Sequence, residues 1–154
     1  MNLLVIGVGN PILGDDAAGI HVARAIKKQL PPRLLVDVKE GFTGGIDLAE
    51  ELLGYDRVIL VDTITGIGKP GVIKKLGINN LDSTRHTSSP HGLNLASALE
   101  ILRRYSPDSI PRDILIIGIS VNDEITITEQ LSKTIKKAID KTISLIMEEI
   151  KKPL

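Results

Sequence analysis

Cysteine and tryptophan are absent from the 154-residue sequence, which holds only one phenylalanine and two tyrosines. The lack of cysteine excludes disulfides, thiolate nucleophiles and zinc-thiolate sites, and it leaves His, Asp and Glu as candidate metal ligands. Basic and acidic residues number 19 each, so no net charge attracts the chain to nucleic acid or anionic lipid. There is no basic leader and no apolar run of the roughly 18 residues that span a bilayer, so we expect a cytoplasmic protein without membrane insertion.

Apolar runs alternate with amphipathic stretches, which is typical of an α/β protein. Short apolar runs predict strands at residues 2–8, 34–38, 57–61, 71–76 and 114–119. Helical spacing of apolar residues predicts helices at 16–30, 46–53, 93–105 and 131–150. The order predicts one domain over residues 1–154, a three-layer sandwich with a mainly parallel twisted sheet and helices on both faces. Residues 77–92 are polar and aperiodic, and they predict a long loop.

A glycine-rich turn follows the first predicted strand and leads into two acidic residues. Gly9 and Gly14 have the spacing of a phosphate-binding loop, but Asp15 and Asp16 stand where lysine and serine or threonine would follow. Because two carboxylates repel phosphate, the turn is suited to a cation. One of the two acids could instead cap the helix that begins here, which would leave its neighbour for chemistry.

Another acidic residue comes directly after a strand. Asp62 follows the apolar run 58–61, which places it at the edge where the carboxyl ends of parallel strands meet and where ligands bind. The alternative interpretation is an Asx turn that closes the strand with Thr63. Asp16 follows the first strand, so we expect it at the same edge.

The chain has three histidines, and the polar loop holds two of them. His91 follows Pro90, whose ring fixes the backbone, and it precedes a predicted helix, so it is the better-held imidazole. His86 has no rigid neighbour to aim it, and we expect His21 to be exposed and idle on the outer face of the first helix. The loop can fold over the sheet edge, so we expect His91 to join the two aspartates there.

Several enzyme motifs are incomplete or missing. Ser88 and Ser89 lie near His91, which makes a Ser/His/Asp hydrolase conceivable, but no G-x-S-x-G elbow is present. The H-E-x-x-H signature of zinc proteases is also absent. The dinucleotide-binding fingerprint fails because Ile12 occupies the third glycine position.

Taken together, the order and spacing of four short motifs resemble the hydrogenase maturation endopeptidases, which process the large subunit of nickel-iron hydrogenases. The similarity runs from Met1 to about Leu102. Its motifs are Gly7-x-Gly9-Asn10, Asp15-Asp16-x-x-Gly19, Val61-Asp62 and Ser89-Pro90-His91.

The resemblance implies an aspartyl-type endopeptidase that removes a C-terminal extension from the large-subunit precursor after nickel insertion. It implies Asp16, Asp62 and His91 as metal ligands, with Asp16 and Asp62 also as catalytic residues. The nickel would be supplied by the substrate, with zinc or cadmium able to substitute in vitro, and would polarise the scissile carbonyl, activate a water or orient the chain. Residues 41–45 (GFTGG) form a glycine-rich loop that is similar to the family's glycine-rich segment, and we expect Gly41, Thr43 and Gly44 to contact substrate.

One segment departs from the family pattern, and two other functions remain open. Family members commonly carry Pro-Glu and Gly-Leu-Ser/Thr stretches after the last strand, whereas residues 120–128 here read SVNDEITIT. This leaves the identity of the processed hydrogenase open. Peptidyl-tRNA hydrolases share a G-x-G-N-P turn, but theirs is followed by T-R-H-N, and this chain has no basic surplus for tRNA. A non-catalytic, nickel-dependent docking factor would use the same three ligands.

Overall fold

The computed structural model describes residues 1–78, 84–86 and 94–153. Its strands are β1 (Leu3–Val8), β2 (Val36–Gly41), β3 (Arg57–Ile64), β4 (Ile73–Leu76) and β5 (Asp113–Ser120). Its α-helices are α1 (Ala18–Gln29), α2 (Gly45–Glu51), α3 (Leu95–Tyr105) and α4 (Lys133–Glu149), with 3-10 turns η1 (Gly14–Ala17) and η3 (Pro107–Ser109). Among these residues, no helix is long and apolar enough to cross a membrane.

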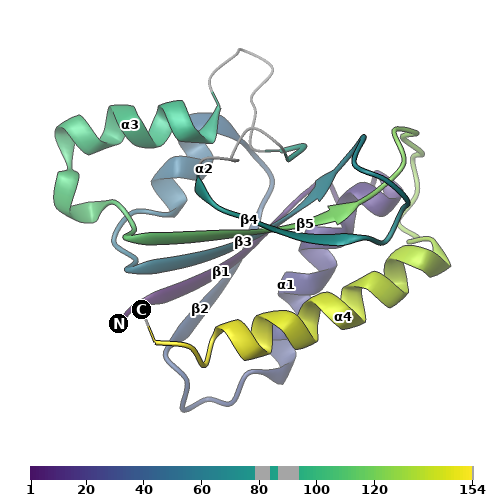
Figure 1. The fold of residues 1–154 in the computed structure, drawn as a ribbon, viewed down its shortest axis with the longest axis horizontal. Helices are drawn as coiled ribbons and strands as arrows, with labels where there is room; N and C mark the ends of the chain where they lie inside the picture. The colour runs from purple at the N-terminus through teal and green to yellow at the C-terminus, as the bar shows by residue number, and fades with distance from the viewer. Residues whose placement is uncertain (79–83, 87–93, 154) are drawn as a thin grey trace.

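The five strands form one sheet in the order β2-β1-β3-β5-β4, with every pair parallel except the edge pair of β4 and β5. Helices α1 and α4 cover one face and α2 and α3 the other, which gives the three predicted layers (Figure 1). The central strands β1 and β3 are buried along their whole length, as expected for strands covered on both faces. The predicted fold class is confirmed.

Several predicted boundaries differ from the observed ones by one to three residues, and three of the differences have a local cause. The first helix begins at Ala18 because Gly14–Ala17 form a 3-10 turn instead of the first α-helical turn. The second strand runs over Val36–Gly41, not residues 34–38, because it pairs with β1 up to Gly41. Strand β3 continues past the apolar run to Ile64, because β5 supplies partners as far as Ser120.

Two glycines let helix α1 lie directly against the backbone of the central strands. A Cβ atom added at Gly19 would lie 2.5 Å from the carbonyl oxygens of both Val8 and Val61. A Cβ atom added at Gly7 would lie 1.9 Å from the carbonyl oxygen of Gly19. Both approaches are far inside van der Waals contact and involve backbone that cannot rotate away. This close packing holds the start of α1, and with it Asp16, over the carboxyl ends of β1 and β3.

We expect Gly19→Ala to destabilise the protein by more than about 2 kcal/mol, because the added methyl group forces α1 away from the sheet. Gly77→Ala is the matched control, since a Cβ atom there meets nothing within 4 Å. Urea unfolding monitored by circular dichroism would measure both changes. Equal stabilities of the two variants would contradict the close-packing interpretation.

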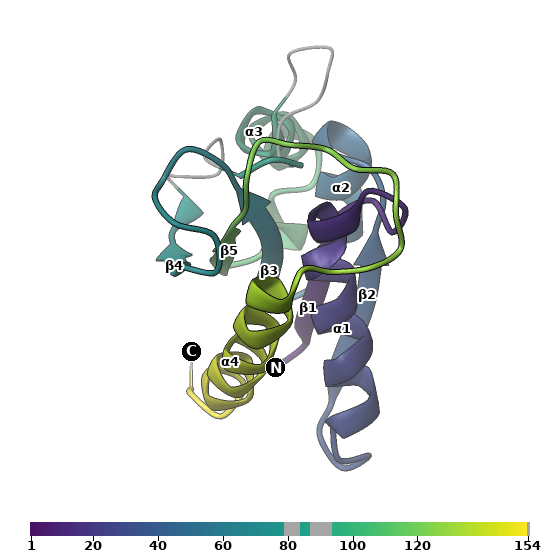
Figure 2. The ribbon, with the colours of Figure 1, turned by 90° about the vertical axis from the view of Figure 1, so that its right-hand side faces the viewer.

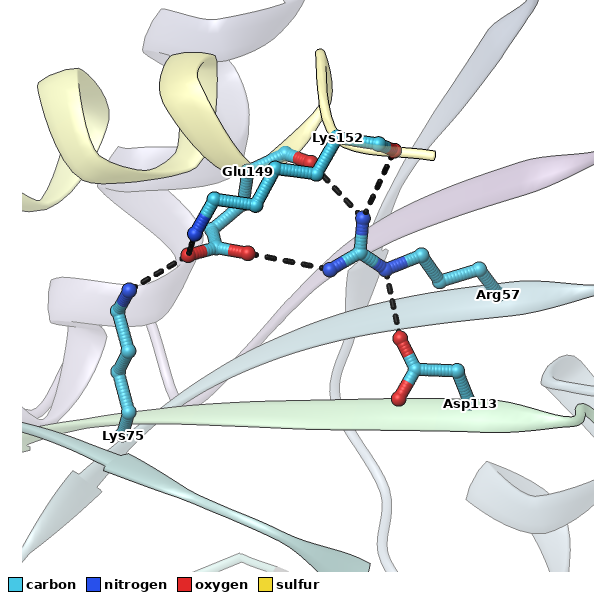
Figure 3. A network of polar contacts seen from close by, with 5 residues as sticks. All are labelled: Arg57, Lys75, Asp113, Glu149 and Lys152. Carbon is cyan, nitrogen blue, oxygen red and sulfur yellow. Dashed lines mark hydrogen bonds and ion pairs between the residues drawn. The ribbon is translucent and has the colours of Figure 1, made fainter. Parts of the chain in front are cut away.

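A network of charged residues joins the end of α4 to Arg57 and Asp113, the first residues of β3 and β5 (Figure 3). The buried Arg57 guanidinium donates to Asp113 Oδ2 (2.7 Å), to Glu149 Oε2 (3.1 Å) and to the Glu149 carbonyl oxygen (2.8 Å). Lys75 and Lys152 both contact Glu149 Oε1. Hydrogen bonds from Lys152 and Lys75 lower the pKa of the Glu149 carboxyl to about 2.

Because the pKa of Glu149 is lower in the folded chain than its ordinary value of 4.5, the network stabilises the fold above about pH 4.5 and loses that effect as the pH falls toward 2. We expect Glu149→Gln to lower the free energy of unfolding at pH 7 by about 2–4 kcal/mol, because Arg57 keeps a buried charge with fewer partners. The difference from wild type should shrink below pH 4.5. Denaturant unfolding between pH 2.5 and 7 tests this, with the exposed neighbour Glu148→Gln as control. A constant difference across that range would contradict the role assigned to the carboxylate charge.

Candidate active site at the carboxyl edge of the sheet

Asp16 turns its side chain back toward the glycine-rich turn instead of capping its own helix. It is 3% exposed, and its Oδ2 atom accepts a hydrogen bond from the backbone N–H of Asn10 (3.0 Å). Neither η1 nor α1 has a side-chain cap. A Cβ atom at Gly9 would lie 2.3 Å from the Asp16 carbonyl oxygen, so the turn requires glycine at this position.

The neighbouring acid, Asp15, contacts a different part of the chain. Its Oδ1 atom accepts a hydrogen bond from the backbone N–H of Ser132 (2.7 Å), the residue that caps α4. The prediction that one member of the pair caps the first helix was therefore wrong, because tertiary partners take both carboxylates. Asp15 fastens the turn to the start of α4, and Asp16 is left facing the sheet edge.

Asp62 lies inside β3 and is completely buried. Its Oδ1 atom accepts a hydrogen bond from the backbone N–H of Thr63 (2.8 Å), the next residue. An Asx turn would bond the N–H two residues on and close the strand, whereas β3 continues to Ile64, so the Asx-turn interpretation was wrong. Its Oδ2 atom accepts one from the backbone N–H of His86 (2.6 Å). A buried carboxylate needs such donors, and three reach this one when the His86 ring is included.

The structure places the His86 ring between the two aspartates. Its Nδ1 atom lies 2.7 Å from Asp62 Oδ1, and its Nε2 atom lies 3.0 Å from Asp16 Oδ2. Arg85 adds an ion pair from Nε to Asp16 Oδ1 (3.3 Å). The prediction that nothing aims His86 was wrong, because the backbone N–H groups of Arg85 and His86 are both bonded to the end of β3. No local pattern in the sequence could have indicated this, since the anchor is 24 residues away.

Charge at this site favours the protonated ring. Burial by itself would lower the pKa of His86, but hydrogen bonds to Asp16 and Asp62 outweigh it and raise that pKa from 6.5 to about 10. His21 shows the opposite shift, because partial burial and the nearby Arg24 lower its pKa. His21 is thus half-buried and not exposed as predicted.

The structure describes two of the three predicted metal ligands, Asp16 and Asp62. Asp16 and Asp62 come together as predicted, joined through one imidazole. His91, together with Ser88 and Ser89, lies outside the described residues. Within residues 1–78, 84–86 and 94–153, no three His, Asp or Glu side chains are arranged to hold a metal ion, because the His86 ring occupies the space between the carboxylates. The donor chemistry of two carboxylates and an imidazole nevertheless suits a divalent transition metal.

The glycine-rich loop lies beside this edge. The carbonyl oxygen of Gly41, the buried last residue of β2, accepts a hydrogen bond from the backbone N–H of Gly9 (3.1 Å). Thr43 is exposed, and Gly44 precedes α2 as its N-cap. Phe42, between them, exposes 61% of its surface. The predicted substrate-contact residues are thus neighbours of the glycine-rich turn, and their contact with substrate stays a prediction.

The segment that departs from the family pattern folds over the same turn. Figure 2 shows the connection from β5 to α4 arching past the start of α1. Thr128 donates its N–H to the Ile12 carbonyl (2.9 Å), and its carbonyl accepts from the N–H of Gly14 (2.8 Å). This one-residue β-bridge joins the segment to the turn, so the changed sequence is compatible with the fold.

The fold and site together define an α/β protein with a buried carboxylate pair at the carboxyl edge of its sheet. The sequence model of the hydrogenase maturation protease family matches residues 20–149. The chain is 27% identical to the hydrogenase 2 maturation protease of Escherichia coli, over 96% of this chain and 92% of that protein. The solved structure of the E. coli hydrogenase maturating endopeptidase HybD superposes with a TM-score of 0.80 at 26% identity, covering 97% and 92% of the two chains.

The chain therefore belongs to the hydrogenase maturation protease family, and it is a peptidase, as the sequence predicts. The structure of a hydrogenase maturation protease from Thermococcus kodakarensis KOD1 supports the fold alone, with a TM-score of 0.72 at 24% identity over 98% and 93% of the chains. Family membership removes the peptidyl-tRNA hydrolase alternative.

We expect the His86 ring of the metal-free protein to remain protonated at pH 8, because two carboxylates contact its two nitrogens. A pKa raised from 6.5 to about 10 means that this contact stabilises the fold fully below pH 6.5 and loses its effect as the pH rises through 10. The stability difference between wild type and His86→Gln should therefore shrink over that range. Imidazole nitrogen NMR and denaturant unfolding would measure the two effects, with His21→Gln as control. Deprotonation of His86 near pH 6.5 would contradict the geometry.

Proposed function

We propose that this protein is the endopeptidase that removes a C-terminal extension from the large-subunit precursor of a nickel-iron hydrogenase after nickel insertion. The observation that carries this proposal is the convergence of Asp16 and Asp62 on one imidazole, at 3.0 and 2.7 Å, at the edge where parallel sheets bind ligands. Family membership supplies the reaction class, peptide-bond cleavage during hydrogenase maturation.

In this proposal the nickel belongs to the substrate. Asp16 and Asp62 bind it through carboxylate oxygens, and His91, which lies between β4 and α3 in the sequence, supplies the third ligand. Zinc or cadmium can take its place in vitro, since the same oxygen and nitrogen donors suit all three ions. Affinity for the precursor then depends on a metal that only a correctly loaded precursor carries, so cleavage is conditional on maturation.

The two carboxylates also account for hydrolysis. Water attacks the scissile carbonyl carbon, and Asp16 or Asp62 accepts the proton that the water loses and passes it to the departing amine. A nickel ion held by the same residues would polarise the carbonyl, activate the water or orient the chain. Phe42 and Thr43 are exposed and directly follow Gly41, which is hydrogen-bonded to the glycine-rich turn, so an extended peptide that crosses the site can contact them and the neighbouring Gly44.

The decisive experiment mixes purified protein with nickel-loaded and nickel-free large-subunit precursor and follows the precursor's length. We expect shortening of the loaded precursor only. Asp16→Asn, Asp62→Asn and His91→Ala should each reduce the rate by about 100-fold or more, because each removes a ligand or the general base. Asp15→Asn is the matched control, since asparagine keeps the oxygen that accepts from Ser132.

Each contrary result has a definite meaning. Cleavage of the nickel-free precursor at the same rate would contradict nickel-dependent recognition. Nickel-dependent binding without shortening would favour the docking factor over the peptidase. Full activity of His91→Ala would remove His91 from the ligand set.

The predicted cytoplasmic location stays a prediction.

A further inference from the structure

Every oxygen of the carboxylate pair already accepts a donor from this chain. Asp62 Oδ1 contacts the Thr63 N–H and His86 Nδ1, and Asp62 Oδ2 accepts the His86 N–H. Asp16 Oδ2 contacts the Asn10 N–H and His86 Nε2, and Asp16 Oδ1 contacts Arg85 Nε. A metal ion needs lone pairs on some of these oxygens, so it competes with the side chains that now use them.

Two of these competing donors come from adjacent residues and carry positive charge. Arg85 is a permanent cation, and its side chain is 20% exposed beside an Asp16 that is 3% exposed. Each ring nitrogen of His86 lies against a carboxylate oxygen, of Asp62 or of Asp16, so both nitrogens donate and the ring is a cation in this geometry. The arginine and the histidine thus balance two buried carboxylates, which is the charge that a single divalent cation would supply.

The position of the two residues is fixed by their backbone and not only by their side chains. The N–H of Arg85 donates to the carbonyl of Thr63 (2.9 Å), and the N–H of His86 donates to Asp62 Oδ2 (2.6 Å). These bonds place both side chains on the carboxylates at the end of β3. The two side chains can still rotate away from the carboxylates about their χ angles, because the backbone bond between Arg85 and Thr63 does not depend on where the side chains lie.

We propose that Arg85 and His86 form an internal cation pair that occupies Asp16 and Asp62 in the metal-free enzyme, and that a divalent metal ion binds only by displacing these two side chains. This inference rests on the proposed function for the metal site and adds a determinant of its affinity and specificity. Neither residue is a ligand of the bound metal; both are positioning residues that set how strongly the metal has to bind.

The internal cation pair has a consequence for substrate choice. Displacement breaks two charge-assisted contacts of His86 and one of Arg85, so part of the metal's binding free energy is used to break them. A free ion has only its own ligand bonds with which to offset that cost. An ion carried by a precursor adds the contacts of the attached peptide, so the internal pair disfavours free metal relative to loaded precursor.

The test is isothermal titration of the chelator-treated full-length protein with Ni²⁺ and, separately, Cd²⁺ at one pH. We expect Arg85→Gln to bind both ions about tenfold more tightly than wild type, because a permanent cation is removed from a buried carboxylate. Arg24→Gln is the matched control, since Arg24 forms an ion pair with Glu40 away from the site. An affinity of Arg85→Gln equal to or weaker than that of wild type would overturn the proposal.

His86→Gln separates the internal cation pair from direct ligation. We expect tighter Ni²⁺ and Cd²⁺ binding in this variant as well, together with a lower melting temperature of the metal-free protein, because Asp16 and Asp62 then repel each other without a charge between them. A residue with only a structural role would lower the melting temperature and leave the affinity unchanged, which contradicts the proposal. Weaker binding would make His86 a metal ligand and would also overturn it.

Failure of this inference is distinguishable from failure of the proposed function. Asp16→Asn and Asp62→Asn should lose the heat of metal binding. If they lose it while Arg85→Gln behaves as wild type, the metal site stands and the internal cation pair fails. If both asparagine variants bind as wild type does, the carboxylates are not ligands, and the metal site of the proposed function fails with the internal pair.

Discussion

Asp62 has no exposed surface, and burial of a carboxyl group costs free energy unless hydrogen-bond donors surround it. Three donors reach this carboxylate: the backbone N–H of Thr63, the backbone N–H of His86 and the ring of His86. Through that ring it is joined to Asp16, which belongs to a different element. The need to satisfy one buried charge therefore organises the carboxyl edge of the sheet.

Backbone packing makes that arrangement possible. Gly7 and Gly19 let α1 approach β1 and β3 more closely than any side chain would permit, and this fixes the position of the turn before the helix. The turn is held from its outer side by the Asp15 contact with Ser132 and by the bridge between Leu13 and Thr128. Asp16 is thus placed by elements on both sides of it.

Buried charged groups lie at both ends of β3, and each group is balanced by partners of opposite charge. At the amino edge of β3, Arg57 is a buried cation surrounded by acceptors, and it joins the sheet to the end of α4. At the carboxyl edge, the carboxylates of Asp16 and Asp62 contact the side chains of Arg85 and His86, which in our proposal a metal ion displaces. The first network has only a structural role, whereas the second, under the proposed function, is the one that exchanges its cation when a metal-loaded substrate binds.

Sequence by itself determined the layered α/β fold and the two central acids. The apolar periods of β1, β3 and α4 are local properties, and Asp16 and Asp62 are recognisable because each comes after an apolar run that predicts a buried strand, at an edge where ligands bind. Only the tertiary structure decided the partners of those acids. Arg85 and His86 are held beside them by backbone bonds to β3, and Asp15 bonds to Ser132 instead of capping its own helix. Carboxylates bond to the donors that the folded chain brings near, and these donors are far away in the sequence.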